Sequence, residues 1–278
     1  MTDPGKPAAL PQTDRDTLEF LLDAAVSSAA GNDHYHPRMS KTVPSPSTPR
    51  AAGKQPRAKQ PAAAPPRRAS AKVAAEGSRT QLERRAEAEM RLLATARQLI
   101  ARRGWTGTTL AEVGEAAGYS RGLAGHYFGS KTGLLRAITT QINNSFFEEL
   151  RKAPPVAPGL EAIVSFVSVY LGRSDPEWTN TRALLLLMTE ALLDDSENSD
   201  QLAKYNASVL QYLEENIRIG TANGEIDRLI SPGVGAEFVL GSLRGMMLQR
   251  LVHGGDVGAL AIRKHVVTLV RRALAPAG

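Results

Sequence analysis

Cysteine is absent from this 278-residue sequence. The chain therefore has no disulfide, no cysteine nucleophile, and no zinc or iron–sulfur site built on thiolate ligands. Long apolar runs are also absent, because the longest, residues 183–188, is far shorter than the roughly 20 residues that a membrane-spanning helix needs. The first residues lack the basic start and apolar core of a secretory signal. These absences predict a cytoplasmic protein that does not partner with a membrane.

Sequence motifs of catalysis are missing as well. The chain has no glycine-rich phosphate loop, no HExxH or GxSxG motif, and no paired acid and base. The five histidines are scattered, and the pair His34 and His36 lies in a low-complexity segment, where it makes a poor metal site. We therefore expect no enzyme, no metal and no cofactor.

Basic charge is concentrated near the N-terminus. Residues 34–80 hold ten Lys or Arg against one acid, Glu76, and are rich in Pro, Ala and Ser. Such a composition cannot bury enough apolar surface to offset its ordering entropy. We predict that residues 1–79 form a disordered basic tail, apart from a short amphipathic helix near residues 18–25. One interpretation is that the tail binds nucleic acid electrostatically. The alternative is that it is a solubilising extension, or that the start codon has been wrongly assigned.

Helix signals begin at Thr80, where the spacing of Thr80 and Glu83 is that of a capping box. Apolar residues then recur every three or four positions until Gly104, which predicts a helix over that range. A second capping box at residues 109–112 opens a short helix that Gly118 ends. Two further helices are predicted over 121–128 and 131–151, each after a serine that can cap it.

Two short helices joined by residues 118–120 predict a helix-turn-helix, whose second helix can enter the major groove of DNA. Ala124 and Phe128, four residues apart, should point inward with Tyr119. The outward face then carries Arg121, Gly122, Gly125 and His126. The two glycines cost helix stability, a loss explained if the backbone must closely approach DNA. Alternatively, they are neutral surface positions and Arg121 is an ordinary solvated charge.

The stretch from Thr108 to Gly122, continuing through Phe128-Gly129-Ser130-Lys131, resembles the signature of the tetracycline-repressor (TetR) family. The resemblance covers residues 85–146, including the long first helix. The chain departs from the family at Ala124 and Gly125, where Leu and Tyr are usual, whereas Tyr127 stands where His or Tyr is usual.

The resemblance implies which side chains meet DNA. Thr108 and Thr109, at a helix N-terminus, are expected to contact phosphate, as are Tyr127 and Lys131. Ser120, Arg121 and His126 are expected to contact phosphate or base edges, with Arg121 suited to guanine. The predicted DNA-binding residues, within a motif spanning 109–128, are Thr108, Thr109, Ser120, Arg121, Gly122, Gly125, His126, Tyr127 and Lys131.

Downstream of the motif the sequence predicts further helices and no strands. We place them at 159–173, 176–194, 199–223, 232–253 and 257–274. The fold class is therefore all-α, with about nine helices. The resemblance implies an N-terminal three-helix DNA-binding domain over 80–146 and a helical ligand-binding and dimerisation domain over 147–278.

The helix that begins at Pro232 is apolar almost all round, so it needs burial on two sides. One side can face its own domain and the other a second subunit. The predicted dimer interface comprises Phe238, Gly241, Gly245, Val266 and Val270. In the family two such helices form a four-helix interface, and a two-fold dimer implies a palindromic operator on double-stranded DNA. The alternative is a simple monomer core.

Aromatic and Met side chains of the C-terminal helices are candidates for an apolar ligand pocket, although such residues are more often plain core. They are Phe147, Phe166, Tyr170, Trp178, Met188, Tyr205, Tyr212 and Met247. Few charges fall on these helix faces, Glu190 being an exception, which favours a small apolar effector. The sequence thus predicts a homodimeric repressor released from its operator by that effector. A helical adaptor that no longer binds DNA is the alternative.

Overall fold

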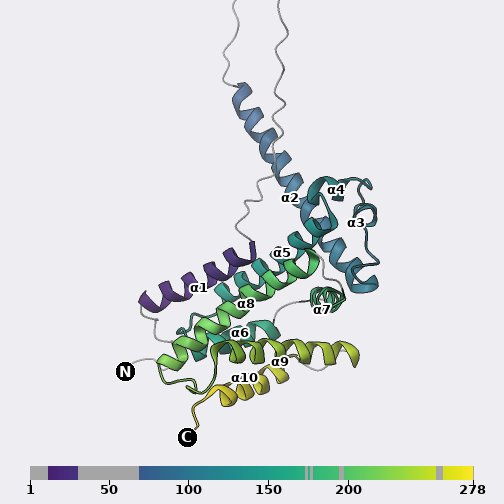
Figure 1. The fold of residues 1–278 in the computed structure, drawn as a ribbon. Helices are drawn as coiled ribbons and strands as arrows, with labels where there is room; N and C mark the ends of the chain where they lie inside the picture. Colours follow the sequence, from purple (N-terminus) through teal and green to yellow (C-terminus); the bar gives the residue numbers. More distant parts are fainter. Residues whose placement is uncertain are drawn as a thin grey trace, which may run out of the picture. The chain divides into compact units, whose positions relative to one another are not determined.

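The computed structural model describes residues 12–30, 69–172, 175, 178–193, 197–254 and 259–277, and every regular element in these ranges is an α-helix (Figure 1). The helices are α1 (Gln12–Ala30), α2 (Ala69–Arg103), α3 (Leu110–Ala116), α4 (Leu123–Phe128), α5 (Lys131–Lys152), α6 (Leu160–Gly172), α7 (Thr179–Ala191), α8 (Glu197–Ala222), α9 (Pro232–Val252) and α10 (Ala259–Leu274). The predicted all-α class is confirmed. Among the described residues, the start of α2, residues 69–88, belongs to a separate unit, whereas the rest of α2 and all the other helices belong to the unit described below.

The helices expected from Thr80 onward correspond to α2 through α10. Helices α7, α8 and α10 begin two or three residues from the expected positions, and the beginnings of α2 and α4 have identifiable causes. Helix α2 begins at Ala69, because the alanine-rich residues 69–75 favour a helix that runs through the expected cap at Thr80. Helix α4 begins at Leu123 with Gly122 as its N-cap. Ser120 does not cap it with its side chain; its carbonyl accepts a hydrogen bond of 3.0 Å from the N–H of Leu123.

Helix α1 lies in the segment that was expected to be a disordered tail, so the expectation is wrong for residues 12–30. The short helix expected near residues 18–25 is real but is part of a longer one. Leu21, Leu22 and Ala25 are buried against α5 and α8. Burial of this apolar face stabilises α1, and the sequence composition alone did not indicate this burial. Residues 1–11 and 31–68 lie outside the described part of the chain.

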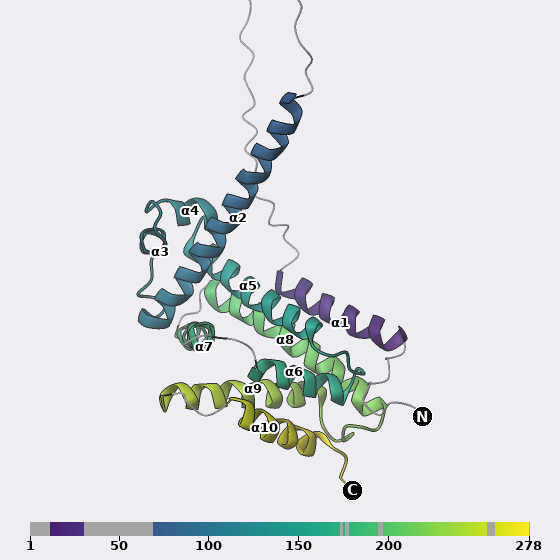
Figure 2. The ribbon, with the colours of Figure 1, turned by 180° about the vertical axis from the view of Figure 1, so that it is seen from behind.

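One hydrophobic cluster holds α2, α3, α4 and the first half of α5 together. It is built from Leu92 and Ile100 on α2, Val113 on α3, Phe128 on α4 and Leu135 on α5. Side chains of α7, Ala183 and Leu187, complete the same cluster, so α7 is packed against the helix-turn-helix region. Figure 2 shows α7 from behind, close to the end of α2.

A second cluster joins α1, α5, α6, α8, α9 and α10. Helix α8 lies alongside α1, α5 and α9, while α10 packs on α6 (Figures 1 and 2). No helix in the described part of the chain is both long and apolar enough to cross a membrane.

Polar side chains are buried where α5 crosses α8. Gln201 donates to the hydroxyl of Thr139 at 3.4 Å, and Ser208 donates to the side-chain carbonyl of Asn143 at 3.5 Å. All four side chains are buried, and Asn143 is fully enclosed. These four residues, which we call the polar layer, make long hydrogen bonds. The C-terminal half of α5 instead packs through aromatic side chains.

Candidate functional site

The turn between α3 and α4 is tight because of two glycines. Gly118 has φ +82°, in the left-handed region where glycine is favoured, and its neighbour Tyr119 donates its N–H to Gly114 at 2.9 Å. A Cβ atom on Gly114 would lie only 2.5 Å from the carbonyl oxygen of Ser120. The predicted helix-turn-helix is present, with α4 as its second helix.

The predicted capping box at the start of α3 is confirmed. The hydroxyl of Thr109 accepts the N–H of Glu112 at 3.3 Å, and the Glu112 carboxylate accepts the N–H of Thr109 at 3.0 Å. Hydrogen bonding by Thr109 holds the pKa of the Glu112 carboxyl below its usual range. Thr109 is exposed, so its side chain lies at the surface where a phosphate would approach.

Thr108 does not present its hydroxyl to the surface. Its side chain is 1% exposed, and the hydroxyl donates to the carbonyl of Gly104 at 2.9 Å. The expected phosphate contact by this hydroxyl is therefore not available in this conformation, because the group closes the turn after α2.

The faces of α4 divide as the spacing predicts. Ala124 and Phe128 are buried in the cluster that holds the DNA-binding helices, with Tyr119 partly buried beside them. Arg121, Gly122 and His126 are exposed, whereas Gly125 and Tyr127 are half-buried. A Cβ atom at either Gly122 or Gly125 would meet nothing within 4 Å, so the backbone there lies open.

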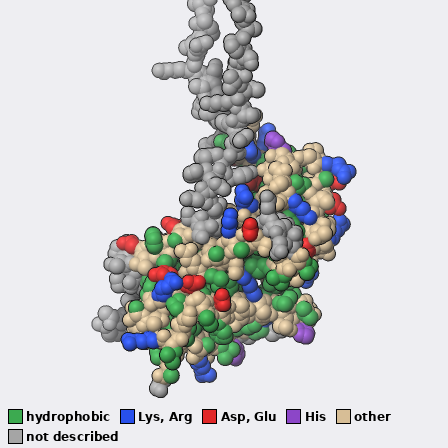
Figure 3. All heavy atoms as spheres, in the orientation of Figure 1, with side chains coloured by type: hydrophobic (Ala, Val, Ile, Leu, Met, Phe, Trp, Pro, Cys, Tyr) green, Lys and Arg blue, Asp and Glu red, His purple; other side chains and the backbone are tan. Residues whose placement is uncertain are grey.

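Charged and aromatic groups flank this open backbone. The guanidinium of Arg121 lies 3.3 Å from the carboxylate of Glu115, and both side chains are well exposed. The rings of His126 and Tyr127 make an edge contact at 6.1 Å. On the face shown in Figure 3, Lys and Arg side chains lie along the outer edge of the α3–α4 region together with Asp and Glu side chains.

Lys131 lies at the first position of α5, which Ser130 caps by accepting the N–H of Gly133 at 3.0 Å. Its ammonium lies 4.7 Å from the centroid of the Trp105 ring, a cation–π contact. Partial burial lowers the pKa of Lys131, an effect that Glu190 and Glu112 oppose. The lysine thus contributes to packing as well as to surface charge.

Glu190 connects α7 to the turn after α2, a role that sequence reasoning missed. Its carboxylate accepts the N–H groups of Trp105 and Thr106 at 2.7 and 2.8 Å, and the hydroxyl of Thr106 at 3.0 Å. A Cβ atom on Gly104, which has φ +75°, would lie 2.4 Å from the same carboxylate. The only signal in the sequence was a carboxylate within an apolar helix.

The outer side of α9 carries an exposed stripe, which we call the α9 stripe. Its residues are Val234, Phe238, Gly241, Gly245, Leu248 and Val252. They are separated by four, three, four, three and four positions, so they share one helix face. Phe238 is 49% exposed, and a Cβ atom on Gly241 or Gly245 would meet nothing within 4 Å. These three residues of the expected interface therefore face outward.

Val266 and Val270 of α10 do not face outward. Both are buried in the second cluster, where α10 packs on α6, whereas their neighbour Leu269 is 62% exposed. Both valines are therefore buried within their own subunit, and their part in an intersubunit interface stays a prediction. The apolar stripe of α10 meets its own domain, and Leu269 was missed because the sequence does not fix the rotation of the helix.

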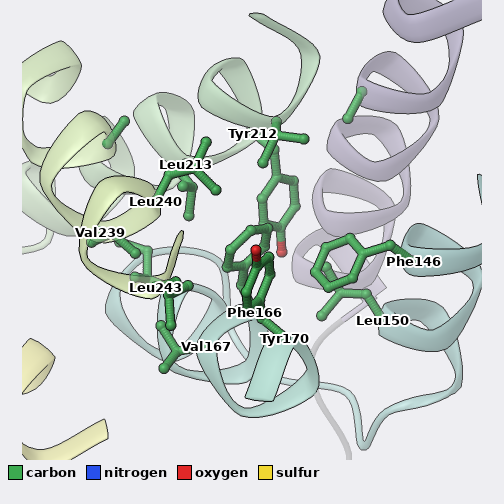
Figure 4. Packing of buried hydrophobic residues seen from close by; sticks show 14 of the residues in the cluster. Phe146, Leu150, Phe166, Val167, Tyr170, Tyr212, Leu213, Val239, Leu240 and Leu243 are labelled. Carbon is green, nitrogen blue, oxygen red and sulfur yellow. The ribbon is translucent and has the colours of Figure 1, made fainter. Parts of the chain in front are cut away.

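Four of the eight expected pocket residues, Phe147, Phe166, Tyr170 and Tyr212, meet in one aromatic cluster, part of which Figure 4 shows. The ring of Phe166 lies 5.9 Å from that of Tyr212 and 6.1 Å from that of Tyr170, and Phe147 lies 5.6 Å from Tyr212. Phe146, which the prediction omitted, faces Phe166 at 5.0 Å. Burial raises the pKa of the Tyr212 phenol, which stays neutral.

The other expected pocket residues lie around this cluster. Tyr205 and Met247 are buried in the same core, while Trp178 and Met188 are partly buried against it. Met188 also touches the cluster of the DNA-binding helices. The set is therefore largely close-packed core, which was the plainer alternative.

Two cavities lie beside the aromatic cluster. One, of about 340 Å³, is bounded by α1, the end of α5 and the following loop, and Tyr212 is its only residue among those predicted for the pocket. Its lining residues are Glu19, Leu22, Leu150, Arg151, Ala153, Pro154, Pro155, Val156, Ser165 and Tyr212. We call it the α1 cavity. The other, of about 140 Å³, is lined by Arg97, Gln141, Asp175 and other polar residues.

No group of three or more side chains suited to a metal ion occurs among the residues that the structure describes.

Residues 92–138 match the family model described as "Bacterial regulatory proteins, tetR family". This range runs from the last third of α2 to the first part of α5 and includes the whole helix-turn-helix. The sequence matches none of the curated proteins.

Solved structures share the fold over about two thirds of the chain. A putative TetR-family transcriptional regulator from Rhodococcus sp. matches with TM-score 0.59 and 22% identity, over 68% of this chain and 100% of its own. FadR from Bacillus subtilis in complex with stearoyl-CoA matches with TM-score 0.57 and 14% identity, over 66% and 98%. AibR in complex with isovaleryl coenzyme A and operator DNA matches with TM-score 0.53 and 22% identity, over 66% and 97%.

Proposed function

Because residues 92–138 match the model of the tetR family of bacterial regulatory proteins, we propose that the chain is a homodimeric repressor that releases a palindromic operator when a small apolar molecule binds its regulatory helices. The observation that carries the proposal is the open side of α4. Gly122 and Gly125 leave backbone accessible there between the exposed side chains of Arg121 and His126. A side chain at either glycine would stand between the helix and a base edge.

Arg121 is the residue that we assign to base recognition. Its guanidinium is exposed and held only by a surface ion pair with Glu115, which a guanine can replace at small cost. Thr109, Ser120, His126 and Lys131 would then contact phosphate or neighbouring base edges.

The α9 stripe supports a two-fold dimer. A stripe of exposed apolar residues with two glycines permits close approach of the same helix from a second copy. Such a dimer would place two copies of α4 one turn of DNA apart, roughly 34 to 36 Å. An inverted repeat would then be the preferred operator.

Effector binding would act through α5, which begins at Lys131 beside the helix-turn-helix and ends beside the aromatic cluster. A displacement of about 3 Å at each α4, small beside the spacing of the two DNA half-sites, would misalign base contacts. FadR and AibR were crystallised with acyl-CoA molecules, whose acyl portion is apolar. For this chain we propose an apolar effector as well.

Binding of the purified protein to the DNA upstream of its own gene, across a salt series, tests the proposal. A specific complex should weaken steeply with salt, because binding releases counterions. Arg121→Ala should reduce discrimination against altered operators, and Lys131→Ala should reduce the salt slope by about 1. Arg228→Ala, at an exposed position outside the DNA-binding helices, is the control. Absence of salt-dependent binding would favour the adaptor alternative.

A further inference from the structure

Helix α1 precedes the part of the chain that matches the family model, which begins at residue 92. It is nevertheless built into the regulatory core. Leu22 is 2% exposed and Ala25 is 1% exposed, both against α5 and α8. A carboxylate oxygen of Asp23 lies 2.7 Å from the guanidinium of Arg151, near the end of α5. The helix is therefore docked by an apolar face and an ion pair at its edge.

The α1 cavity lies directly under this helix. Leu22 and Glu19 supply its α1 wall, the loop of residues 153–156 supplies another, and the aromatic cluster reaches it through Tyr212. Its volume, about 340 Å³, falls at the lower end of the range typical of small-molecule pockets. Displacement of α1 would open the cavity on that side, since the helix carries two of its lining residues.

The lining is apolar with few hydrogen-bonding side chains. Leu22, Leu150, Val156 and two prolines offer apolar surface, and Ser165 and Tyr212 carry hydroxyl groups. The two hydroxyls can orient one polar group of a ligand, and the remaining polar lining residues, Glu19 and Arg151, are charged.

Charges around the cavity disfavour an anion. Glu19 lines it, and Asp23 and Glu148 stand beside it, both paired with Arg151. The guanidinium of Arg151 is thus already shared by two carboxylates. The last carbonyl groups of α5 add negative potential at this end of the helix. The exposed Lys152 is the only other cation in this turn.

We propose that the α1 cavity is the effector site, that α1 forms its outer wall, and that it takes an uncharged, largely apolar molecule with one polar group. The site rejects a polyanion such as the nucleotide portion of an acyl-CoA. The term effector rests on the proposed function, whereas the binding site and its ligand class do not.

Two related fluorescent probes test the ligand class on the full-length protein. N-phenyl-1-naphthylamine is uncharged, and 1-anilinonaphthalene-8-sulfonate has the same ring systems with a sulfonate added. We expect the uncharged probe to bind at least tenfold more tightly. Equal binding, or tighter binding of the sulfonate, would overturn the proposal, because the acidic surroundings would then have no influence.

Filling the cavity tests the location. Val156→Trp and Ser165→Phe each place a bulky group in the α1 cavity and should weaken binding of the uncharged probe at least tenfold. Leu229→Trp adds the same bulk at a position that is 92% exposed and should leave binding unchanged. Circular dichroism verifies that each variant is folded. Unchanged affinity in a folded cavity variant would contradict the assignment.

The absence of cysteine allows the α1 wall to be tested without filling the cavity. In Ala25→Cys the new thiol is shielded while α1 is docked. A ligand that binds only when α1 is docked should therefore slow the reaction of this thiol with a thiol reagent. At ten times the dissociation constant the expected slowing is about elevenfold. Phe20→Cys, on the exposed face of the same helix, should react at one rate with or without the probe. An unchanged rate at position 25 with bound probe would show that α1 is not part of the site.

None of these measurements contains DNA, so they separate this inference from the proposed function. A protein that fails to bind its operator can still bind the probe under α1. Conversely, an operator-binding protein that fails the probe and thiol tests would keep the proposed function and lose this site.

Discussion

The carboxylate of Glu190 in α7 accepts a hydrogen bond of 2.7 Å from the backbone N–H of Trp105, just after α2. The same carboxylate accepts the N–H of Thr106 at 2.8 Å. Because α7 also contributes Ala183 and Leu187 to the cluster of the DNA-binding helices, a charged contact and an apolar contact join the same two regions. Movement of α7 therefore reaches the helix-turn-helix through the turn that precedes it.

Removal of this carboxylate should uncouple the two regions. We expect Glu190→Ala to lower the free energy of unfolding by about 1.5–3 kcal/mol, the range for hydrogen bonds to a charged group. Glu190→Gln, which keeps one acceptor oxygen, should cost less. Thermal melting and release of the operator complex by ligand are the readouts, with Asp200→Asn, at an exposed position of α8, as the control. If Glu190→Ala has the melting temperature and the ligand-induced operator release of the parent, the contact does not couple α7 to the helix-turn-helix.

Two glycines of the helix-turn-helix should respond in opposite ways to the same substitution. Gly118→Ala places a Cβ on a residue with φ +82° and should destabilise the protein by roughly 1–2 kcal/mol. Gly125→Ala, inside α4 and facing open space, should instead stabilise it by roughly 0.5–1 kcal/mol. Urea unfolding measures both.

The operator affinity of Gly125→Ala should fall even though the protein is more stable. The added methyl group would occupy space between α4 and the bases, which a structural role alone would not require. Equal or tighter operator binding by this variant would remove the reason given for the glycine.

A charge in the α9 stripe should dissociate the proposed dimer. Phe238→Glu would bury a carboxylate against an apolar partner surface, and we expect at least a hundredfold rise in the dimer dissociation constant, about 2.7 kcal/mol. Leu229→Glu, at a more exposed position outside the stripe, should have no effect. Sedimentation equilibrium distinguishes the two, and a parental dimer in Phe238→Glu would place the interface elsewhere.

Acid should weaken the contact between α6 and α10. Arg271 donates to the carboxylate of Glu161 at 2.6 Å, and this hydrogen bond holds the pKa of Glu161 below its ordinary 4.5. A lowered carboxyl pKa adds stability above pH 4.5, and that stability is lost as the pH falls through the folded-state pKa. Both side chains are about 40% exposed, so the gain is under about 1 kcal/mol.

Melting temperatures from pH 6 to pH 3 provide the check. Relative to the parent, Glu161→Gln should be less stable at pH 6 and should approach the parent as the pH falls below 4.5. Arg271→Gln should lose the same acid-dependent portion. A difference between parent and variant that is constant across this range would exclude the ion pair as its source.

The sequence determines most of the helices because their signals are local. The capping box of Thr109 and Glu112, the cap at Ser130 and the positive-φ glycines at 104 and 118 each depend on neighbouring residues only. The same holds for the inward face of α4. These features could be predicted from spacing and from the residues that helix ends prefer.

Features that depend on tertiary contacts were missed. Nothing local places Glu190 beside Trp105, since the two residues are 85 positions apart. Helix α1 was expected only over residues 18–25, and its full length depends on packing against α5 and α8. The inward rotation of Val266 likewise depends on where α6 lies. In each case packing against a distant element decided the outcome.

The two halves of α5 are seated differently, and this fixes how the helix can move. Near its middle the helix rests on the polar layer, whose long hydrogen bonds each contribute at most about 1 kcal/mol. Around Phe146 it is interlocked with close-packed rings that resist sliding. We therefore expect α5 to pivot near Phe146. The segment from Lys131 to Phe146, 15 residues or roughly 22 Å long, would then act as the lever arm. A tilt of about 8° on that arm would carry the helix-turn-helix through about 3 Å.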